Sequence, residues 1–456
     1  MLTTLGVARG VALLAVLALV AAACGPAPDE DDPDDVADED AAFTWAVTGA
    51  DGPTHEAVAD LWNEENPDQQ VDLELLSPEA DDQRQAMFND QVTGAGEYDV
   101  LGLDVIWTGE FAEAGFIENL DDMRDAVDGY SIPGTVESAE WQGELWAVPY
   151  VTGFGFLYYR TDLVDEPPET WEDLYDTVLE VQEDNPDIDG YVGQGDTYEG
   201  FVVNYLEYLW SAGGEVFDEE QSASLLLEGD HAERAITFMQ DAFEEGVFAS
   251  DFNTMVEDDA RLAFQAGDAI FMRNWPYAYP LALEDDDDDP SDVVGDFDIA
   301  PLPTFEGTDA DTISTLGGLN NAVSTLSENQ DVAREFVEWA ATDREVQEIL
   351  AEMQPPPTAQ WVYDEYEDFL DEDLHPIYEV LEQVQEEGRA RPPVPGYNSF
   401  SLAVQENLHA VYAEGADPGP ALETVNEAAE DALVEEIDPD EEAEELDDAV
   451  DEEADE

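Results

Sequence analysis

The chain contains no lysine, and its 11 basic residues are all arginines, whereas its acidic residues number 117. The formal net charge is therefore -106. This scarcity of positive charge excludes nucleic acid as a partner, because phosphate contacts require a basic surface. Hydrophobic residues still make up 43% of the chain and aromatic residues 10%. Because disordered acidic chains have few aromatic residues, we expect a folded protein with its acidic residues mostly on the surface.

A charge of this size repels itself and destabilises a compact state at low ionic strength. In molar salt the Debye length falls to about 3 Å, and the repulsion is screened. The composition is therefore typical of a halophilic protein whose acidic surface is solvated. A specific acidic-partner role is the alternative.

Cysteine is almost absent, and a single cysteine, Cys24, excludes an internal disulfide. Residues 1–23 contain one arginine, Arg9, followed by an apolar run over 11–23, which is the layout of a signal peptide. The apolar run is too short to span a bilayer comfortably. Three alanines precede Cys24 and Gly25 follows it, as in a bacterial lipobox, which predicts lipidation of Cys24 and anchoring to the outer face of a membrane. Ordinary cleavage, with Cys24 incidental, is the alternative.

Two acidic segments flank the folded part of the chain. Residues 24–41 read as an extended, self-repelling tether, and residues 438–456 as a disordered acidic tail. The body over 42–437 is longer than a chain that usually folds around a single hydrophobic core, so we expect two domains.

The first third of the body alternates between strand and helix patterns. Segments 43–47, 71–76 and 98–107 are typical of strands, and helical periodicity fills 54–67 and 81–94 between them. This order predicts a parallel α/β sheet. Ligands bind at the carboxyl ends of the strands in such sheets, which draws attention to Asp104. Later segments predict helices over 170–184, 201–214 and 232–246 and a strand over 190–195.

Motifs for catalysis or metal binding are weak. The four histidines, at positions 55, 231, 375 and 409, are far apart and none is paired at metal-ligand spacing. A calcium-loop-like spacing over 185–196 starts with Asn185-Pro186 and ends on Asp196, which does not suit calcium. We therefore expect no metal and no cofactor. A secreted glycoside hydrolase stays open as an alternative, since so many acids supply carboxylate pairs by chance.

Aromatic residues fall at the expected tips of loops from separate elements: Trp107, Tyr150, Tyr198, Trp275 and Tyr277. Aromatic rings offer a flat apolar area with a negative π face, on which the C–H faces of carbohydrates stack. Packing in a large core is the alternative for any one of these rings.

Several ordered stretches resemble the extracellular sugar-binding proteins of ATP-driven (ABC) importers, and within them the trehalose/maltose-binding group. They include DVLGLDVIWTGEF, GELWAVPY, FLYYRTDLV, GDAIFMRNWPYAYPL, STLGGLNNAVS and ARPPVPGYNSF. The likeness runs from about Phe43 to Val434. It implies a two-lobed α/β periplasmic-binding-protein-like fold, with hinge crossovers and a cleft between the lobes. It also implies a monomer that is not an enzyme, that binds a disaccharide or short α-glucoside, and that docks on ABC permease subunits with their ATPase.

The resemblance divides the body between two lobes. The N-lobe takes residues 42–149 and 316–370, and the C-lobe takes residues 150–315 and 371–437. The mechanism it implies is capture of the sugar by hinge closure.

The resemblance also implies roles for individual residues. Asp104 accepts sugar hydroxyls, Trp275 and Tyr277 form an aromatic wall, the backbone of Gly318 approaches the sugar, and Arg391 is the cationic hydroxyl donor. The remaining expected ligand-binding residues are Arg84, Tyr198 and Glu199.

Two further residues near the aromatic wall have expected roles. Pro276 is expected to start a helix facing the cleft, and Arg273 to pair with an acid and brace the wall. Two positions depart from the family pattern: Gly153 replaces an Asp and Leu319 replaces a Trp. Each departure removes a sugar contact, so the particular sugar is left open.

Overall fold

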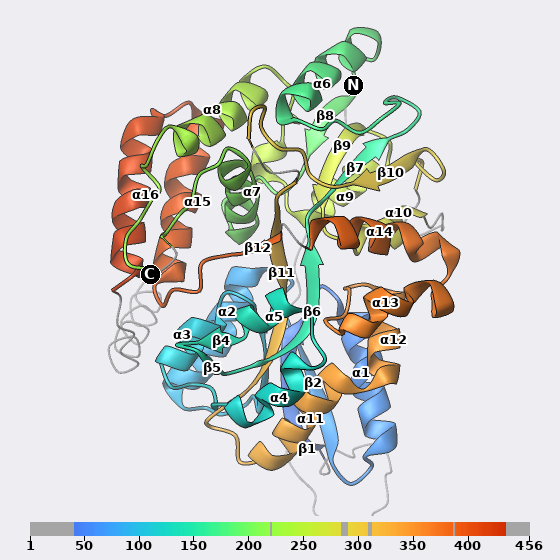
Figure 1. The fold of residues 1–456 in the computed structure, drawn as a ribbon, viewed down its shortest axis with the longest axis vertical. Coiled ribbons are helices and arrows are strands. Elements are labelled where there is room, and N and C mark those ends of the chain that lie inside the picture. Colours follow the sequence, from blue (N-terminus) through green and yellow to red (C-terminus); the bar gives the residue numbers. More distant parts are fainter. Residues whose placement is uncertain (1–40, 219–220, 284–290, 309–311, 386–387, 435–456) are drawn as a thin grey trace, which may run out of the picture. The chain divides into compact units, whose positions relative to one another are not determined.

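The protein is described by a computed structural model over residues 41–218, 221–283, 291–308, 312–385 and 388–434 (Figure 1). The expected signal peptide, Cys24, nearly all of the tether and the acidic tail lie outside these residues. Within the described residues, no helix is long and apolar enough to cross a membrane.

The first sheet begins as the sequence predicts. Strands β1 (Ala41–Thr48), β2 (Gln70–Leu76) and β3 (Val100–Asp104) are parallel, with β1 in the middle. Helices α1 (Gly52–Glu65) and α2 (Ala80–Thr93) connect them, which confirms the predicted α/β pattern. Gly94 ends α2 in the left-handed conformation that favours glycine at a helix C-terminus.

Three strands from later in the chain complete the first sheet. Strand β11 (Ser314–Val323) runs antiparallel to both β3 and β6 (Val148–Phe154), and β12 (Gly388–Ala390) lies parallel to β11. Helices α11 (Gln330–Thr342) and α12 (Arg344–Met353) pack beside this sheet and α1. The smaller elements of this part are α3 (Thr108–Glu113), η1 (Asp121–Met123), α4 (Arg124–Asp128), α5 (Pro133–Ser138), β4 (Glu140–Trp141), β5 (Glu144–Leu145) and α13 (Gln360–Phe369).

The second sheet has the order β10-β7-β9-β8. Its strands are β7 (Phe156–Arg160), β8 (Asp189–Val192), β9 (Ala269–Asn274) and β10 (Phe297–Ala300). Helices of this part are α6 (Trp171–Asp184), α7 (Glu199–Ser211), α8 (His231–Glu244), η2 (Phe252–Thr254), α9 (Glu257–Gln265), α10 (Ala278–Leu283), η3 (Glu372–Leu374), α14 (His375–Val384), α15 (Tyr397–Glu414) and α16 (Pro418–Ala432). The Thr170 side chain caps α6 by accepting the Asp173 N–H at 3.0 Å.

Helix α7 is buried along its whole length. Its sequence, EGFVVNYLEYLWS, is apolar on nearly every face, as expected for a helix enclosed by other elements. It contacts α8, α15 and strand β11. Because β11 belongs to the first sheet while α8 and α15 belong to the second part of the fold, α7 contacts both parts.

The chain passes between the two sheets at crossovers that matter for the site. Strand β6 of the first sheet leads through Gly155 into β7 of the second (Figure 1). The chain returns between β10 and β11, crosses again between α13 and η3, and reaches the first sheet once more at β12, between α14 and α15. The first two connections meet where the Ser314 hydroxyl donates to the Gly155 carbonyl.

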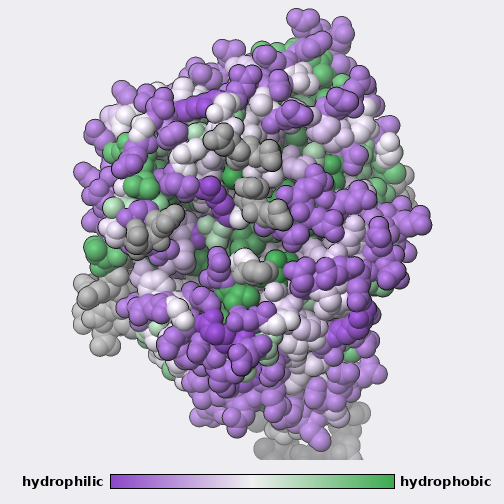
Figure 2. Space-filling view, viewed as in Figure 1, coloured by the Kyte–Doolittle hydropathy of each residue, from purple (hydrophilic) through white to green (hydrophobic). Residues whose placement is uncertain are grey.

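The surface is acidic, as the composition predicts. Hydrophilic residues cover most of the face drawn in Figure 2. The aromatic residues instead fill the core, where Phe43, Trp45, Trp62 and Phe336 pack edge to face around the first sheet.

Candidate ligand-binding site

The residues expected to bind a ligand lie at the ends of strands and at one helix start. Asp104 is the last residue of β3, Trp275 directly follows β9 and Arg391 directly follows β12. Glu199 is the first residue of α7. These four positions come from both sheets and from the crossover at β12.

Arg391 joins two carboxylates that belong to different parts of the fold. Its Nη2 lies 2.7 Å from Asp104 Oδ1, and its Nη1 lies 2.7 Å from Glu199 Oε1. The Arg391 side chain is 2% exposed, and its Nε has no hydrogen-bond partner in the described part of the chain. Each terminal nitrogen of the guanidinium therefore bonds one carboxylate, and the N–H of the buried Nε is left without an acceptor among the described residues.

Glu199 is the most heavily coordinated carboxylate of the group. Besides Arg391, the Tyr397 hydroxyl donates to it at 2.7 Å, and Ser401 also donates to it. Burial raises the pKa of Glu199, and Arg391 opposes that rise. Burial likewise raises the pKa of Asp104 against the charge of Arg391.

Three aromatic rings gather around Glu257, at the start of α9. The Tyr198 hydroxyl donates to Glu257 Oε2 at 2.8 Å. Burial raises the pKa of Glu257, and hydrogen bonds from the Tyr198 and Trp275 side chains lower it. Burial and then the charge of Glu257 raise the pKa of Tyr277 well above its usual value. Tyr198, Trp275 and Tyr277 are all half-buried, so they form a partly exposed aromatic wall.

Glycines make room for the Trp275 indole. A Cβ on Gly317 would stand 2.9 Å from the indole Cζ3 and Cη2, and one on Gly153 would stand 3.8 Å from its Cε3. The Gly317 contact is too close for a side chain, whereas the distance at Gly153 is ordinary van der Waals contact, so Trp275 packs beside β6 at Gly153 without requiring a glycine there. Leu319, the second departure, is buried in β11 opposite Asp104.

Gly318 is held by the sheet itself. Its φ is +125°, and a Cβ there would stand 2.1 Å from the Val151 carbonyl oxygen. Its own carbonyl accepts the Val105 N–H at 3.2 Å, directly beside Asp104. Only glycine adopts this conformation at such close quarters.

Arg84, on α2, is paired with an acid of α3, close to the first sheet. It makes two contacts with the Glu110 carboxylate, one of them from Nε to Oε2 at 2.9 Å, and its guanidinium lies 4.8 Å from the Phe88 ring centroid. Its charge also acts on Asp81, which lies at the start of α2.

Two acids near the site were missed from the sequence. Asp51 follows β1, and burial raises its pKa to about 7. Its charge acts on Tyr150 and Tyr277. Asp81 is solvent-exposed, yet desolvation raises its pKa while the Glu199 N–H and Arg84 lower it. The rule that singled out Asp104, a carboxylate at the carboxyl end of a parallel strand, would also have found Asp51.

Several details of the sequence interpretation are wrong. Trp107 and Tyr150 are buried in the core, 3% and 0% exposed, so neither is a loop-tip ring. Pro276 lies in the turn before α10, which begins at Ala278 and has only 6 residues. Pro276 therefore does not start a helix that faces the ligand.

Arg273 occupies the place that the sequence predicts. It is fully buried, its Nη2 lies 2.6 Å from Glu207 Oε1, and its Cζ lies 4.0 Å from the Trp275 ring centroid. The expectation that Arg273 pairs with an acid and supports the aromatic wall is confirmed.

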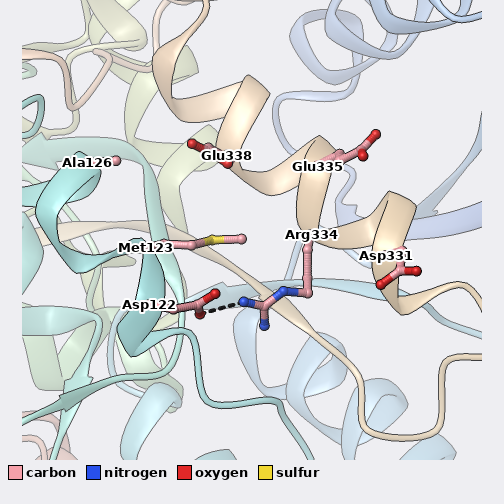
Figure 3. Close-up of a pocket in the computed structure, with 7 residues that line it drawn as sticks. All are labelled: Asp122, Met123, Ala126, Asp331, Arg334, Glu335 and Glu338. Atoms are coloured by element: carbon pink, nitrogen blue, oxygen red, sulfur yellow. Dashed lines mark hydrogen bonds and ion pairs between the residues drawn. The ribbon is translucent and has the colours of Figure 1, made fainter.

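A separate hollow of about 400 Å³ lies between the η1–α4 segment and α11 (Figure 3). Arg334 bonds Asp122 there, and the remaining lining residues are Met123, Ala126, Asp331, Glu335 and Glu338. No residue expected to bind the ligand lines it. Among the described residues, no cluster of three or more His, Cys, Asp or Glu side chains is arranged to hold a metal ion.

Comparisons with known proteins point to one family. The model of the bacterial extracellular solute-binding protein family matches residues 45–347. A probable ABC transporter-binding protein of Deinococcus radiodurans is 31% identical over 366 residues, which are 76% of this chain and 83% of that protein. A maltotriose-binding protein of Pyrococcus abyssi is 26% identical over 249 residues, covering 54% of this chain and 51% of that protein.

Solved structures share the fold. The maltose-bound MalE3 of T. maritima has a TM-score of 0.77 at 30% identity and covers 85% of this chain and 98% of its own. A solute-binding protein of Agrobacterium radiobacter in complex with ribitol has a TM-score of 0.73 at 21% identity, covering 86% and 98%. The second likeness supports the two-lobed fold alone.

Proposed function

Because this chain belongs to the family of bacterial extracellular solute-binding proteins, we propose that it captures a neutral sugar for an ABC importer. The sugar is a disaccharide such as maltose or trehalose, or a short α-glucoside. The family consists of transport proteins that work outside the cytoplasm and is not a family of enzymes. Maltose and maltotriose, named for two of the similar proteins, suggest this ligand class.

The observation that carries the proposal is the partly exposed aromatic wall beside hydroxyl-accepting carboxylates. Trp275, Tyr277 and Tyr198 converge on Glu257. Asp104 ends β3, which pairs with β11, and Gly317 of β11 lies against the Trp275 ring. A sugar stacks its C–H face on such rings, while carboxylates accept its hydroxyl protons and Arg391 donates to its oxygens.

The charge of the site favours a neutral ligand. Asp51 and Glu257 lie beside the wall and Asp81 lies near Asp104. The cations around them already bond carboxylates: Arg84, Arg261, Arg273 and Arg391. A phosphate or carboxylate ligand would meet repulsion here and would need a cation that is released from its partner.

Capture proceeds by hinge closure. In this proposal the N-lobe comprises residues 42–149 and 316–370, and the C-lobe residues 150–315 and 371–437. Sugar contacts to both lobes stabilise the closed form, which docks on the permease subunits, and their ATPase supplies the energy. We also propose that the mature protein is a monomer anchored to the membrane through lipidated Cys24.

A fluorescence titration in molar salt tests the proposal. We expect maltose, trehalose or maltotriose to change tryptophan emission saturably, without release of reducing sugar. Ribitol belongs in the panel because a fold relative binds it. If no compound in this panel changes the emission, the proposed function is wrong; release of reducing sugar would favour a hydrolase instead.

Replacing Trp275 by alanine tests the site. We expect the variant to lose about 1–3 kcal/mol of binding free energy, because the stacking area is lost. Trp361→Ala is the matched control, since Trp361 is also half-buried and stacks under an arginine, with the Arg344 Cζ 4.0 Å from its ring centroid. Equal dissociation constants for the two variants would contradict the site assignment.

A further inference from the structure

A fully buried ion pair lies directly behind the aromatic wall. The Arg273 side chain is 0% exposed and that of Glu207 is 2% exposed. The pair is bidentate, with Nη2 to Oε1 at 2.6 Å and Nε to Oε2 at 3.0 Å. Arg273 Nη1 also donates to Gln194 Oε1 at 3.0 Å, an oxygen that accepts from Asn204 Nδ2 as well. The guanidinium orientation is therefore fixed by several partners.

The pair touches Trp275 on one side. The Arg273 Cζ lies 4.0 Å from the centroid of the Trp275 ring, which is stacking distance for a cation on an aromatic face. The flat guanidinium thus supports one face of the indole.

The same pair touches two of the crossovers between the sheets. A Cβ on Gly155, between β6 and β7, would stand 2.5 Å from Arg273 Nη2 and 2.7 Å from Glu207 Oε1, so the pair packs directly on that backbone. On the other crossover, the Thr315 N–H donates to Glu207 Oε1 at 3.1 Å. Ser314 links both crossovers by donating to the Gly155 carbonyl at 3.0 Å.

A stabilising role alone does not account for a charged pair at this place. Well-packed apolar residues of similar volume usually stabilise a protein core as well as a buried ion pair does. A charged, hydrogen-bonded pair can also form a directional link, which apolar residues cannot. Here the link joins the face of the Trp275 indole to the backbone N–H of Thr315.

We propose that Arg273 and Glu207 are positioning residues that couple the Trp275 ring to the crossovers at Gly155 and Thr315. The inference rests on the proposed function. A sugar stacked on Trp275 favours the ring position that packs on the fixed guanidinium of Arg273, and Glu207, bonded to that guanidinium, holds Thr315 in the closed arrangement. The ligand thereby acquires the differential contact with the two states that any closure requires.

The test replaces both charges at once, because a single replacement leaves an unpaired buried charge. The variant is Arg273→Met with Glu207→Leu. Spin labels at Asp60→Cys on α1 and Glu180→Cys on α6, with Cys24→Ser, report the distance between the lobes; both labelled positions are exposed. The full chain is measured in molar salt without sugar and with saturating maltose, trehalose or maltotriose.

We expect the double variant to unfold at nearly the wild-type temperature but to bind roughly 2- to 30-fold more weakly. Its label distance should be broader without sugar and should shift less on sugar addition. Arg160→Met is the control, because Arg160 lies in the same sheet but pairs with the partly exposed Asp162. That control should keep wild-type affinity and closure.

The outcomes separate the two proposals. Wild-type affinity and closure in the double variant would overturn the coupling while leaving the proposed function intact. If the wild-type protein binds no sugar of the panel, the proposed function is wrong. The distance distributions of the wild type and the double variant without sugar would then decide whether the pair still sets the arrangement of the lobes. If the double variant does not fold, Arg273→Gln with Glu207→Gln replaces it under the same criteria, because this pair of substitutions leaves no buried charge and keeps an oxygen for the Thr315 N–H.

Discussion

Replacing Arg391 by methionine would measure what the link between Asp104 and Glu199 contributes to stability. Methionine retains much of the side-chain volume but leaves two carboxylates without their cation. Removing one partner of a buried ion pair costs about 3–5 kcal/mol. Tyr397 and Ser401 still donate to Glu199, and the Ile106 N–H still donates to Asp104. We therefore expect the free energy of unfolding to fall by about that amount rather than by twice it.

Arg389→Met provides the matched control. Arg389 lies on β12, two residues before Arg391, and pairs with Glu215, with exposed fractions of 38% and 46% for the two side chains. Exposed pairs of this kind contribute about 0–1 kcal/mol and less in high salt. The two variants thus compare a buried cation with an exposed one on the same segment.

The assay is urea unfolding in molar salt, followed by tryptophan fluorescence from pH 7.5 down to pH 5. Burial already raises the pKa of Asp104 and Glu199, and without Arg391 both values rise further. Because the protonated forms suit a buried site, the stability deficit of the variant is greatest above these raised pKa values and shrinks as the pH falls through them. Equal losses for Arg391→Met and Arg389→Met, or a deficit that stays constant with pH, would refute this reasoning.

Two further substitutions give distinct expectations. Burial raises the pKa of Asp51 to about 7 from 3.8, so its ionisation destabilises the fold as the pH rises between these values. In urea titrations, the stability of Asp51→Asn relative to wild type should therefore increase from pH 4.5 to 7.5. Parallel pH profiles of the two proteins would contradict this expectation. Gly318→Ala should lower the free energy of unfolding by about 2 kcal/mol or more, since its φ is +125° and the new Cβ would meet the Val151 carbonyl. Gly134→Ala is its control, because no atom lies within 4 Å of the added Cβ, and equal melting temperatures for the two alanine variants would count against the steric reasoning.

Local patterns along the chain were enough to place the elements of the first third of the body and four later ones, α6, β8, α7 and α8. The alternation of apolar strands and amphipathic helices gave β1, α1, β2, α2 and β3, because these elements bury residues at periods that the sequence displays directly. The same strand-end rule singled out Asp104. Ordered family-like stretches then indicated a sugar-binding protein of an importer, and the comparisons bear out the class of ABC-transporter solute-binding proteins.

Burial was harder to foresee than secondary structure. Trp107 and Tyr150 looked like loop-tip rings but lie in the core. A ring beside a turn has the same local sequence signature whether it faces solvent or another element, so only packing decides its exposure.

What the sequence by itself determined is the composition of the surface, the strand and helix order, and the need of Arg273 for an acidic partner. Which of the 117 acidic residues is that partner, Glu207, is visible only in the tertiary structure. The pairing depends on distances between segments that are far apart in the chain. Glu207 lies 66 residues from Arg273, and Arg391 reaches Glu199 and Asp104 across 192 and 287 residues. Charge pairing has no sequence period, so the crossovers and the buried helix α7 decided which carboxylates belong to the site.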